Sequence, residues 1–233
     1  MQLLNTNQSN TKIRKSAEGS PYRIASLSMK PDDIICPASK AADCRKDCLF
    51  HAGRGTMQSV INARSDKSRY WHNDRDGFLA QLCNELFRFI KSCKRSGDLP
   101  AARLNTISDI NWEYYGIPSM FPELFMYDYT KRAARLGKTP DNYKLMFSYS
   151  SAPAYQGSVA KALRTSAPIA VVFRGGFPDY YLNRPVIDGD KSDLFNLKSE
   201  NQIVALKLKG GKSIQQSRSA FIVDNPELLE VAA

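Results

Sequence analysis

YKLMFSYSSAPAYQGSVAKALRTSAPIAVVFRG, residues 143–175, is the stretch that decides the fold. Two apolar, β-prone runs, 143–150 and 168–175, flank a segment at 154–165 whose composition favours a helix. The second run contains IAVVF, which is continuously apolar, as expected of a strand covered on both faces. A strand, a helix and another strand in succession predict two parallel strands joined by a helical crossover.

Strand and helix signals continue to alternate on both sides of this stretch. Further strands are expected at 23–29, 102–110, 202–210 and 219–223, and further helices at 57–72 and 76–93. The β-prone run FMYDYT (125–130) is expected as a strand, between a helix that ends near Leu124 and another that starts after Lys131. The alternation predicts an α/β fold with a mostly parallel sheet. An open sheet fits this pattern, and so does a (β/α) barrel-like domain, complete or incomplete, which we expect.

The helix expected at 76–93 has the clearest pattern in the chain. Asp76 is the expected N-cap, and Gly97 follows the C-terminal end. Apolar residues recur at spacings of three or four, as in an amphipathic helix: Leu79, Leu82, Leu86 and Ile90.

The length and composition predict one domain preceded by an arm. The chain has 233 residues, of which 42% are hydrophobic, enough for one large core. Residues 1–20 are polar and are interpreted as a flexible arm, and residues 21–233 as a single domain. The longest apolar run is far shorter than the roughly 20 residues that span a bilayer, and no secretory signal is apparent. We therefore expect a cytoplasmic protein without a membrane partner.

The charge of the chain is strongly positive. It carries 33 Lys and Arg residues against 23 Asp and Glu residues, which gives a net charge of +10. Such an excess favours an anionic partner, such as nucleic acid, a phosphorylated metabolite or an acidic protein. Because the charges are scattered along the sequence, a basic surface that is merely solvated fits equally well.

Three of the five cysteines, Cys36, Cys44 and Cys48, lie within 13 residues, in the pattern C-x7-C-x3-C. In a chain without an export signal, such a cluster indicates a metal site rather than disulfides. Thiolates are the usual ligands of iron–sulfur clusters. Three cysteines can hold three irons of a [4Fe-4S] cluster and leave the fourth open, and loss of that iron gives a [3Fe-4S] form. Lys40, Arg45 and Lys46 would offset the charge of the thiolates.

Two alternatives to a cluster stay open for this cysteine loop, which follows the first expected strand. His51 lies three positions after Cys48, so Cys36, Cys44, Cys48 and His51 could form a Cys3His zinc site. The cysteines could also be unliganded thiols. Zinc knuckles more often use C-x2-C pairs, which this loop lacks.

Polar residues at expected strand ends are the next candidates, because ligands of parallel α/β folds gather at the carboxyl ends of the strands. Cofactor-binding candidates are Arg103, Asn105, Ser108 and Arg174. If 102–110 is a strand, Arg103, Asn105 and Ile107 share one face. Asp109 then lies near the loop, as a catalytic residue or as a cap of the next helix.

Tyr129 and Lys131 come at the end of the run FMYDYT and, if it is a strand, share one face. They join Asp109 as candidate catalytic residues that line a pocket above the open iron. Asp188 and Asp190 form a charged turn that could hold a cation, although a plain turn explains them better.

The chain resembles the gene-product-88 family of phage proteins. The resemblance runs from Cys36-Pro37 through Cys44 and Cys48, and covers most of residues 22–224. It includes three further short segments: RLNTISD (103–109), YDYTK (127–131) and VIDGDKSD (186–193). It implies a phage-encoded, cysteine-liganded iron–sulfur protein, with a barrel similar to that of radical S-adenosylmethionine enzymes. The C-x3-C-x2-C spacing of those enzymes is absent here.

The sequence and the resemblance together predict an iron–sulfur protein that serves in redox or cluster-dependent chemistry in the cytoplasm of an infected host cell. A zinc-stabilised module that binds nucleic acid is the alternative. A module that binds a host protein is a third hypothesis.

Overall fold

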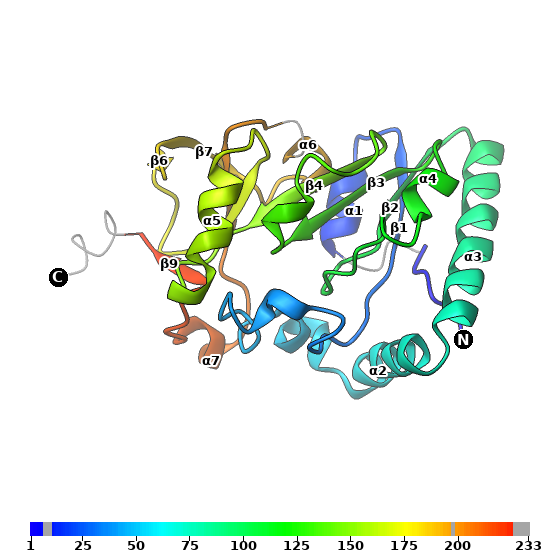
Figure 1. Cartoon of the computed structure of the whole chain (residues 1–233), viewed down its shortest axis with the longest axis horizontal. Helices are drawn as coiled ribbons and strands as arrows, with labels where there is room; N and C mark the ends of the chain where they lie inside the picture. Colours follow the sequence, from blue (N-terminus) through cyan, green and yellow to red (C-terminus); the bar gives the residue numbers. More distant parts are fainter. Residues whose placement is uncertain (7–10, 197–198, 226–233) are drawn as a thin grey trace. The chain divides into compact units, whose positions relative to one another are not determined.

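The structure is a computed structural model that describes residues 1–6, 11–196 and 199–225 (Figure 1). Its described residues form two compact units. The first comprises Met1–Cys36, Met57–Asp128 and Thr139–Lys144, and the second comprises Pro37–Thr56, Tyr129–Lys138 and Leu145–Ala233. Residues 7–10 of the expected arm, and residues 197–198 and 226–233 of the expected domain, lie outside the described residues.

Helices and parallel strands alternate in the first unit, as expected. Its elements are α1 (Thr11–Ala17), β1 (Tyr22–Ser26), α2 (Gln58–Asn73), α3 (Arg75–Ser96), β2 (Leu99–Arg103), α4 (Ile117–Met120) and the first part of β3 (Phe125–Thr130). β2 runs parallel to both β1 and β3. Ile24 of β1 lies opposite Ala101 of β2, and both are fully buried. The core of this unit therefore includes its sheet.

α3 confirms the expected helix and corrects its start. Asp74, and not Asp76, is the N-cap, because the carboxylate of Asp74 accepts a hydrogen bond from the Gly77 N–H at 2.9 Å. At the other end, Gly97 adopts the left-handed conformation (φ 77°), which glycine tolerates without strain. Phe78 and Leu82 are among the residues that the helix buries.

The strand expected at 102–110 is wrong in its position. β2 covers Leu99–Arg103 and ends there. After it, the Asn105 N–H donates at 2.7 Å to the side-chain carboxylate of Asp128 on β3, and not to a backbone carbonyl of that strand. The alternation of faces expected for Asn105 and Ile107 therefore does not apply, because both residues lie beyond the strand.

The second unit is built around β5. Its helices and strands are the end of β3, β4 (Tyr143–Ser148, shared with the first unit), α5 (Gln156–Leu163), β5 (Ile169–Arg174), β6 (Tyr180–Tyr181), β7 (Arg184–Asp188), α6 (Asp193–Asn196), β8 (Ile203–Lys207), α7 (Lys212–Gln215) and β9 (Ile222–Asp224). β5 pairs in parallel with β4, β8 and β9. The strand–helix–strand prediction for residues 143–175 is thus confirmed.

The pairing order of the strands is β1-β2-β3-β4-β5-β8-β7-β6, and β9 pairs with β5. All the described pairings of these strands are parallel except the β6–β7 pair, which is antiparallel. The fold is therefore α/β with a largely parallel sheet, and the cysteine loop follows β1, as expected. Across the described residues β1 and β6 do not pair with each other, so a closed barrel is not confirmed.

The described residues of the expected N-terminal arm belong to the first unit. Leu3 is fully buried, and Asn5 forms an antiparallel bridge with Ser26 of β1. The division into an arm and one domain stays a prediction. In the part of the chain that the structure describes, no helix is both long and apolar enough to cross a membrane.

Candidate functional site

The cysteine loop, defined as residues 36–56, consists of turns and short 3-10 helices. These helices are Pro37–Ser39, Leu49–His51 and Gly53–Thr56. Turn-forming residues explain why the segment has no long element: Pro37 removes a backbone donor, and Gly53 has a positive φ of 52°. Asp43 also adopts a positive φ, 48°. A loop of this kind can place several side chains without the period of a helix or a strand.

All three cysteines of the loop are free thiols. Cys36 is the last residue of the first segment of the first unit, and its N–H donates to the Asp32 carbonyl at 2.9 Å. Cys44 and Cys48 belong to the second unit. The thiol of Cys44 lies 3.6 Å from the Ser39 carbonyl, and the sulfur of Cys48 accepts a hydrogen bond from the Phe50 N–H at 3.5 Å.

Two aspartates between and beside these cysteines anchor the loop to the segment before β9. Asp43 accepts the Ala220 N–H at 3.0 Å. Asp47, which is buried, accepts the hydroxyl of Ser217 at 3.0 Å. The sequence pattern did not single out these aspartates or Ser217. Each aspartate and its partner lie 170 or 177 positions apart in the chain, and no local signal links them. The anchors hold the backbone around Cys44 and Cys48 in one arrangement.

The chemistry of the three side chains fits a thiophilic metal centre, since thiolate is the ligand that zinc and iron–sulfur clusters share. The structure does not, however, bring the three side chains together as a complete metal centre. Among the residues that the structure describes, no three His, Cys, Asp or Glu side chains come together as a metal-binding group. Iron–sulfur and zinc binding by Cys36, Cys44 and Cys48 therefore stay predictions, as does the participation of His51.

The side chain of Asp32 accepts hydrogen bonds in the segment before Cys36. Asp32 accepts hydrogen bonds from the Ile34 and Ile35 N–H groups at 2.8 Å, and lies 2.7 Å from Nε2 of His72. Burial alone would raise the pKa of Asp32, but these hydrogen bonds and the nearby imidazole outweigh it and lower that pKa below its usual value. The carboxylate thus stays ionised and fixes the turn that leads into Cys36.

The two cysteines outside the loop have raised thiol pKa values. Burial raises the pKa of Cys83 and, despite Arg23 nearby, also that of Cys93. Because the thiolate is the form that binds metal, a raised pKa disfavours a ligand role at both positions. Cys83 therefore offers a control for the cysteines of the loop.

A buried polar network occupies the segment after β2. Asn105 donates from its side chain to the Ile110 carbonyl at 2.9 Å and accepts from the Ser108 hydroxyl at 2.8 Å. Asp128 accepts from the backbone N–H of Asn105 at 2.7 Å and from the hydroxyl of Tyr143 at 2.8 Å. The structure thus brings the predicted site residues Asn105 and Ser108 together.

Asp109 lies next to the start of the cysteine loop. It is 2% exposed, and its N–H donates to the carbonyl of Ile35, the residue before Cys36, at 2.9 Å. Arg103, the last residue of β2, is buried in the same unit. The structure therefore places one candidate catalytic residue beside the segment that carries the first cysteine.

Tyr129 and Lys131 lie at the end of β3, as predicted, in the second unit. The Tyr129 hydroxyl donates to the buried Asp193 carboxylate at 2.8 Å. The Lys131 ammonium lies 3.4 Å from the Ser148 hydroxyl and 5.2 Å from the centre of the Phe221 ring. Both side chains therefore contact neighbouring groups of the second unit.

The remaining charged candidates form ion pairs. Arg174, at the end of β5, pairs with Asp224 at 3.3 Å and donates to the Ser217 carbonyl. Asp190 pairs with Lys209 at 2.5 Å and accepts the Lys207 N–H at 3.0 Å, so the turn after β7 is held by its own side chains. A plain turn therefore explains the position of Asp190, and the sequence likewise favoured a turn over a cation site here.

An α/β fold with a largely parallel sheet, carrying three free thiols on the loop after its first strand, defines the class of the protein. Within that class, the chain belongs to the Gene product 88 family, whose sequence model matches residues 2–225. No match was found among curated proteins or among solved structures.

Proposed function

We propose that the chain is a phage-encoded iron–sulfur protein in which Cys36, Cys44 and Cys48 ligate the cluster. The observation that carries the proposal is the presence of these three free thiols on one short loop between β1 and α2. Such a cluster would supply redox or cluster-dependent chemistry in the infected cell. The proposal includes a barrel, complete or incomplete, similar to that of radical S-adenosylmethionine enzymes, as the family resemblance implies.

The environment of the sulfurs supports this proposal. The Phe50 N–H points at the sulfur of Cys48, and N–H donors of this kind stabilise thiolates and tune the potentials of clusters. Arg45, between the second and third cysteines, donates to the Ser39 hydroxyl at 2.8 Å and keeps a positive charge in the loop.

Binding would also have to bring the three sulfurs together. Metal binding is coupled to folding, because a preformed site rarely exists in an unfolded segment. The loop has no strand to break, so it can adjust, while the anchors at Asp43 and Asp47 limit how far Cys44 and Cys48 move.

The proposed catalytic residues are Asp109, Tyr129 and Lys131, and the proposed cofactor-binding residues are Arg103, Asn105, Ser108 and Arg174. The N–H bond from Asp109 to Ile35 supports the choice of Asp109, because it ties that residue to the start of the loop. Lys131 offers an ammonium group that could hold an anionic substrate or donate a proton.

Single substitutions test the ligand assignment. Cys36→Ala, Cys44→Ala and Cys48→Ala should each lose most of the bound iron, because each removes one thiolate from the set. Iron and sulfide are measured in protein purified without oxygen, and circular dichroism checks that each variant is folded.

Cys83→Ala is the matched control, since Cys83 is a free thiol with a raised pKa outside the loop. It should retain the iron of the unsubstituted chain. Folded loop variants that keep their full iron content would refute the assignment.

The net charge of +10 favours a second candidate function, a zinc-stabilised module that binds nucleic acid. In this case the affinity for single- or double-stranded DNA should fall steeply with salt, with a slope of about −0.7 to −0.9 per phosphate contacted. Fluorescence anisotropy at several salt concentrations measures it. Binding that is absent, or insensitive to salt, would reject this candidate. Binding to a host protein instead should survive substitution of Asp109 or Lys131.

A further inference from the structure

The solvent-facing side of the last turns of α3, in the first unit, is strongly basic. From residue 87 to residue 95, the exposed residues of the helix fall three or four positions apart or next to each other, so they lie on one face. Four of the five are cations and one is aromatic. These five residues form the basic face of α3: Phe87, Arg88, Lys91, Lys94 and Arg95.

Most of this positive charge is not neutralised. Lys94 pairs with the exposed carboxylate of Glu123 at 3.6 Å. Among the residues that the structure describes, Arg88, Lys91 and Arg95 form no ion pair. Three cations of the face are therefore available to an anionic partner.

The acids on either side of the face in the chain are engaged by other groups. Glu85, the last acid of α3 before the face, accepts the backbone N–H groups of Leu3 and Leu4 at 3.0 and 2.7 Å. Asp98, two residues beyond the helix, pairs with Arg23 at 3.6 Å. Neither carboxylate is thus the partner of the three cations.

The stability of the helix does not explain this arrangement. Like charges three or four positions apart destabilise a helix, and Lys91 lies at these spacings from Arg88 and Arg95. The helix dipole favours cations near the C-terminal end, but this effect is confined to the last turn. The last turn contains Lys94 and Arg95 and neither of the other two cations. Arg88 and Lys91 therefore point to a function of the face.

Phe87 is the aromatic member of the face, and it is 62% exposed. The core takes up other apolar side chains of α3, such as Leu86 and Ile90. A helix that lies on a membrane presents a broad apolar side to the lipid, and α3 presents only this one ring on its basic face. Proteins that hold single-stranded nucleic acid combine an exposed ring, which stacks on a base, with cations that bind phosphates. The basic face has both features.

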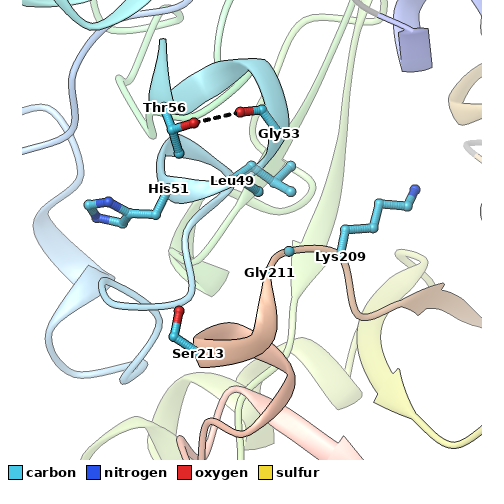
Figure 2. A pocket seen from close by; sticks show the side chains of 9 residues that line it. Leu49, His51, Gly53, Thr56, Lys209, Gly211 and Ser213 are labelled. Carbon is cyan, nitrogen blue, oxygen red and sulfur yellow. Dashed lines mark hydrogen bonds between the residues drawn. The ribbon is translucent and has the colours of Figure 1, made fainter. Parts of the chain in front are cut away.

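The donors around a cleft in the second unit, beside the end of the cysteine loop, do not converge in this way. Figure 2 shows that the ammonium group of Lys209 points away from Gly211 and Ser213. This ammonium group also pairs with Asp190 at 2.5 Å. The basic face of α3 is therefore the better candidate for an anionic partner.

We propose that the basic face of α3 binds single-stranded nucleic acid. Arg88, Lys91 and Arg95 bind the phosphates, and the ring of Phe87 stacks on a base. From Arg88 to Arg95 the helix rises about 10 Å, the axial length of about three nucleotides in one strand of B-DNA. Nucleic-acid binding is the second candidate function, on which this inference rests, and the binding itself requires neither zinc nor a cluster.

A triple variant, Arg88→Gln, Lys91→Gln and Arg95→Gln, tests the phosphate contacts in the full chain. Fluorescence anisotropy with labelled oligothymidylate at several salt concentrations measures the affinity. The variant should bind about tenfold more weakly or worse. The slope of log affinity against log salt should become shallower by about 2, because each phosphate contact on a single strand contributes about 0.7. Glutamine forms helices well, so the melting temperature should not fall.

The matched control removes three exposed cations outside α3: Lys144→Gln, Lys161→Gln and Arg164→Gln. It lowers the net charge by the same amount and should bind nearly as tightly as the unsubstituted chain. Equal losses in the two triple variants would overturn the proposal, because the affinity would then follow the total charge and not this face.

Phe87→Ala tests the stacking contact. It should weaken the binding of oligothymidylate about tenfold and leave the salt slope unchanged, because stacking releases no counterion. Met120→Ala, at another exposed apolar residue of the first unit, is the control and should have no effect. If Phe87→Ala binds as the unsubstituted chain does, or if a duplex of the same length binds more tightly than the single strand, the assignment to a single strand is wrong.

Vesicles of phosphatidylserine and phosphatidylcholine test a lipid surface as the partner. Vesicle binding that the Arg88, Lys91 and Arg95 variant loses, without binding of oligothymidylate, would overturn the proposal. Absence of oligothymidylate binding by the unsubstituted chain would reject this surface and the second candidate function together, whereas binding that survives the triple substitution would reject the surface alone. Iron measured in the same samples should be equal in all variants, so the cluster is tested separately.

Discussion

At the scale of residues, Asn105 shows how a side chain can end a strand. Its backbone N–H turns to Asp128, and its amide group binds both the N–H and the carbonyl of Ile110 at 2.9 Å. The sequence marks this position only as polar. A period-two pattern extends the strand through it, because the pattern cannot show that the partner is an aspartate 23 residues away.

Asn105→Ala should destabilise the chain by about 3 kcal/mol, because it leaves the buried groups of Ile110 and Asp128 with fewer partners. Chemical unfolding monitored by circular dichroism measures the loss. Asn62→Ala is the control: Asn62 is exposed on α2, and its hydrogen bond to Gln58 is at the surface. That variant should change stability by less than about 0.5 kcal/mol. Equal effects at the two positions would contradict the role given to Asn105.

The cysteines illustrate another limit at this scale. Their identity and spacing can be read from the sequence, and thiolate chemistry follows from them. The role of the aspartates that anchor their loop cannot be read from the sequence, since Asp47 and its partner Ser217 are 170 positions apart. Such contacts depend on the sheet that brings distant segments together.

At the scale of elements, the central strand–helix–strand stretch and α3 were predictable because each has a strong pattern. The β-prone run at 143–150 becomes β4, and the continuously apolar run IAVVF becomes part of β5. Of the recurring apolar residues of α3, Leu82, Leu86 and Ile90 are buried. β7 was not predicted. Its sequence, RPVID, contains a proline and only two apolar residues, and only its first residue is buried.

The start of α3 offers a test at this scale. Asp74→Ala should lower stability by about 1 kcal/mol, because it removes the side-chain cap on the Gly77 N–H. Asp76→Ala, two residues further, is the control. Asp76 lies in the first turn without a capping bond, so its effect comes from the helix dipole alone, about 0.3 kcal/mol. Thermal unfolding of both variants measures the difference. A larger loss for Asp76→Ala would show that the helix begins later.

At the scale of the whole molecule, the alternation of strands and helices was sufficient to predict an α/β fold with a largely parallel sheet. It was not sufficient to predict the order of the strands. β5 pairs with β8 and β9, which lie some 30 to 50 positions further along the chain, and local patterns carry no information on such pairing. The net charge of +10 likewise bears on partners and not on the fold.

The central claim is that Cys36, Cys44 and Cys48 ligate an iron–sulfur cluster. The most direct test is metal and sulfide analysis, together with an absorption spectrum, of the full chain purified without oxygen. The account predicts brown protein that contains iron and sulfide and absorbs near about 400 nm through charge transfer from sulfur to iron. Colourless protein with stoichiometric zinc, or with no metal, would contradict it.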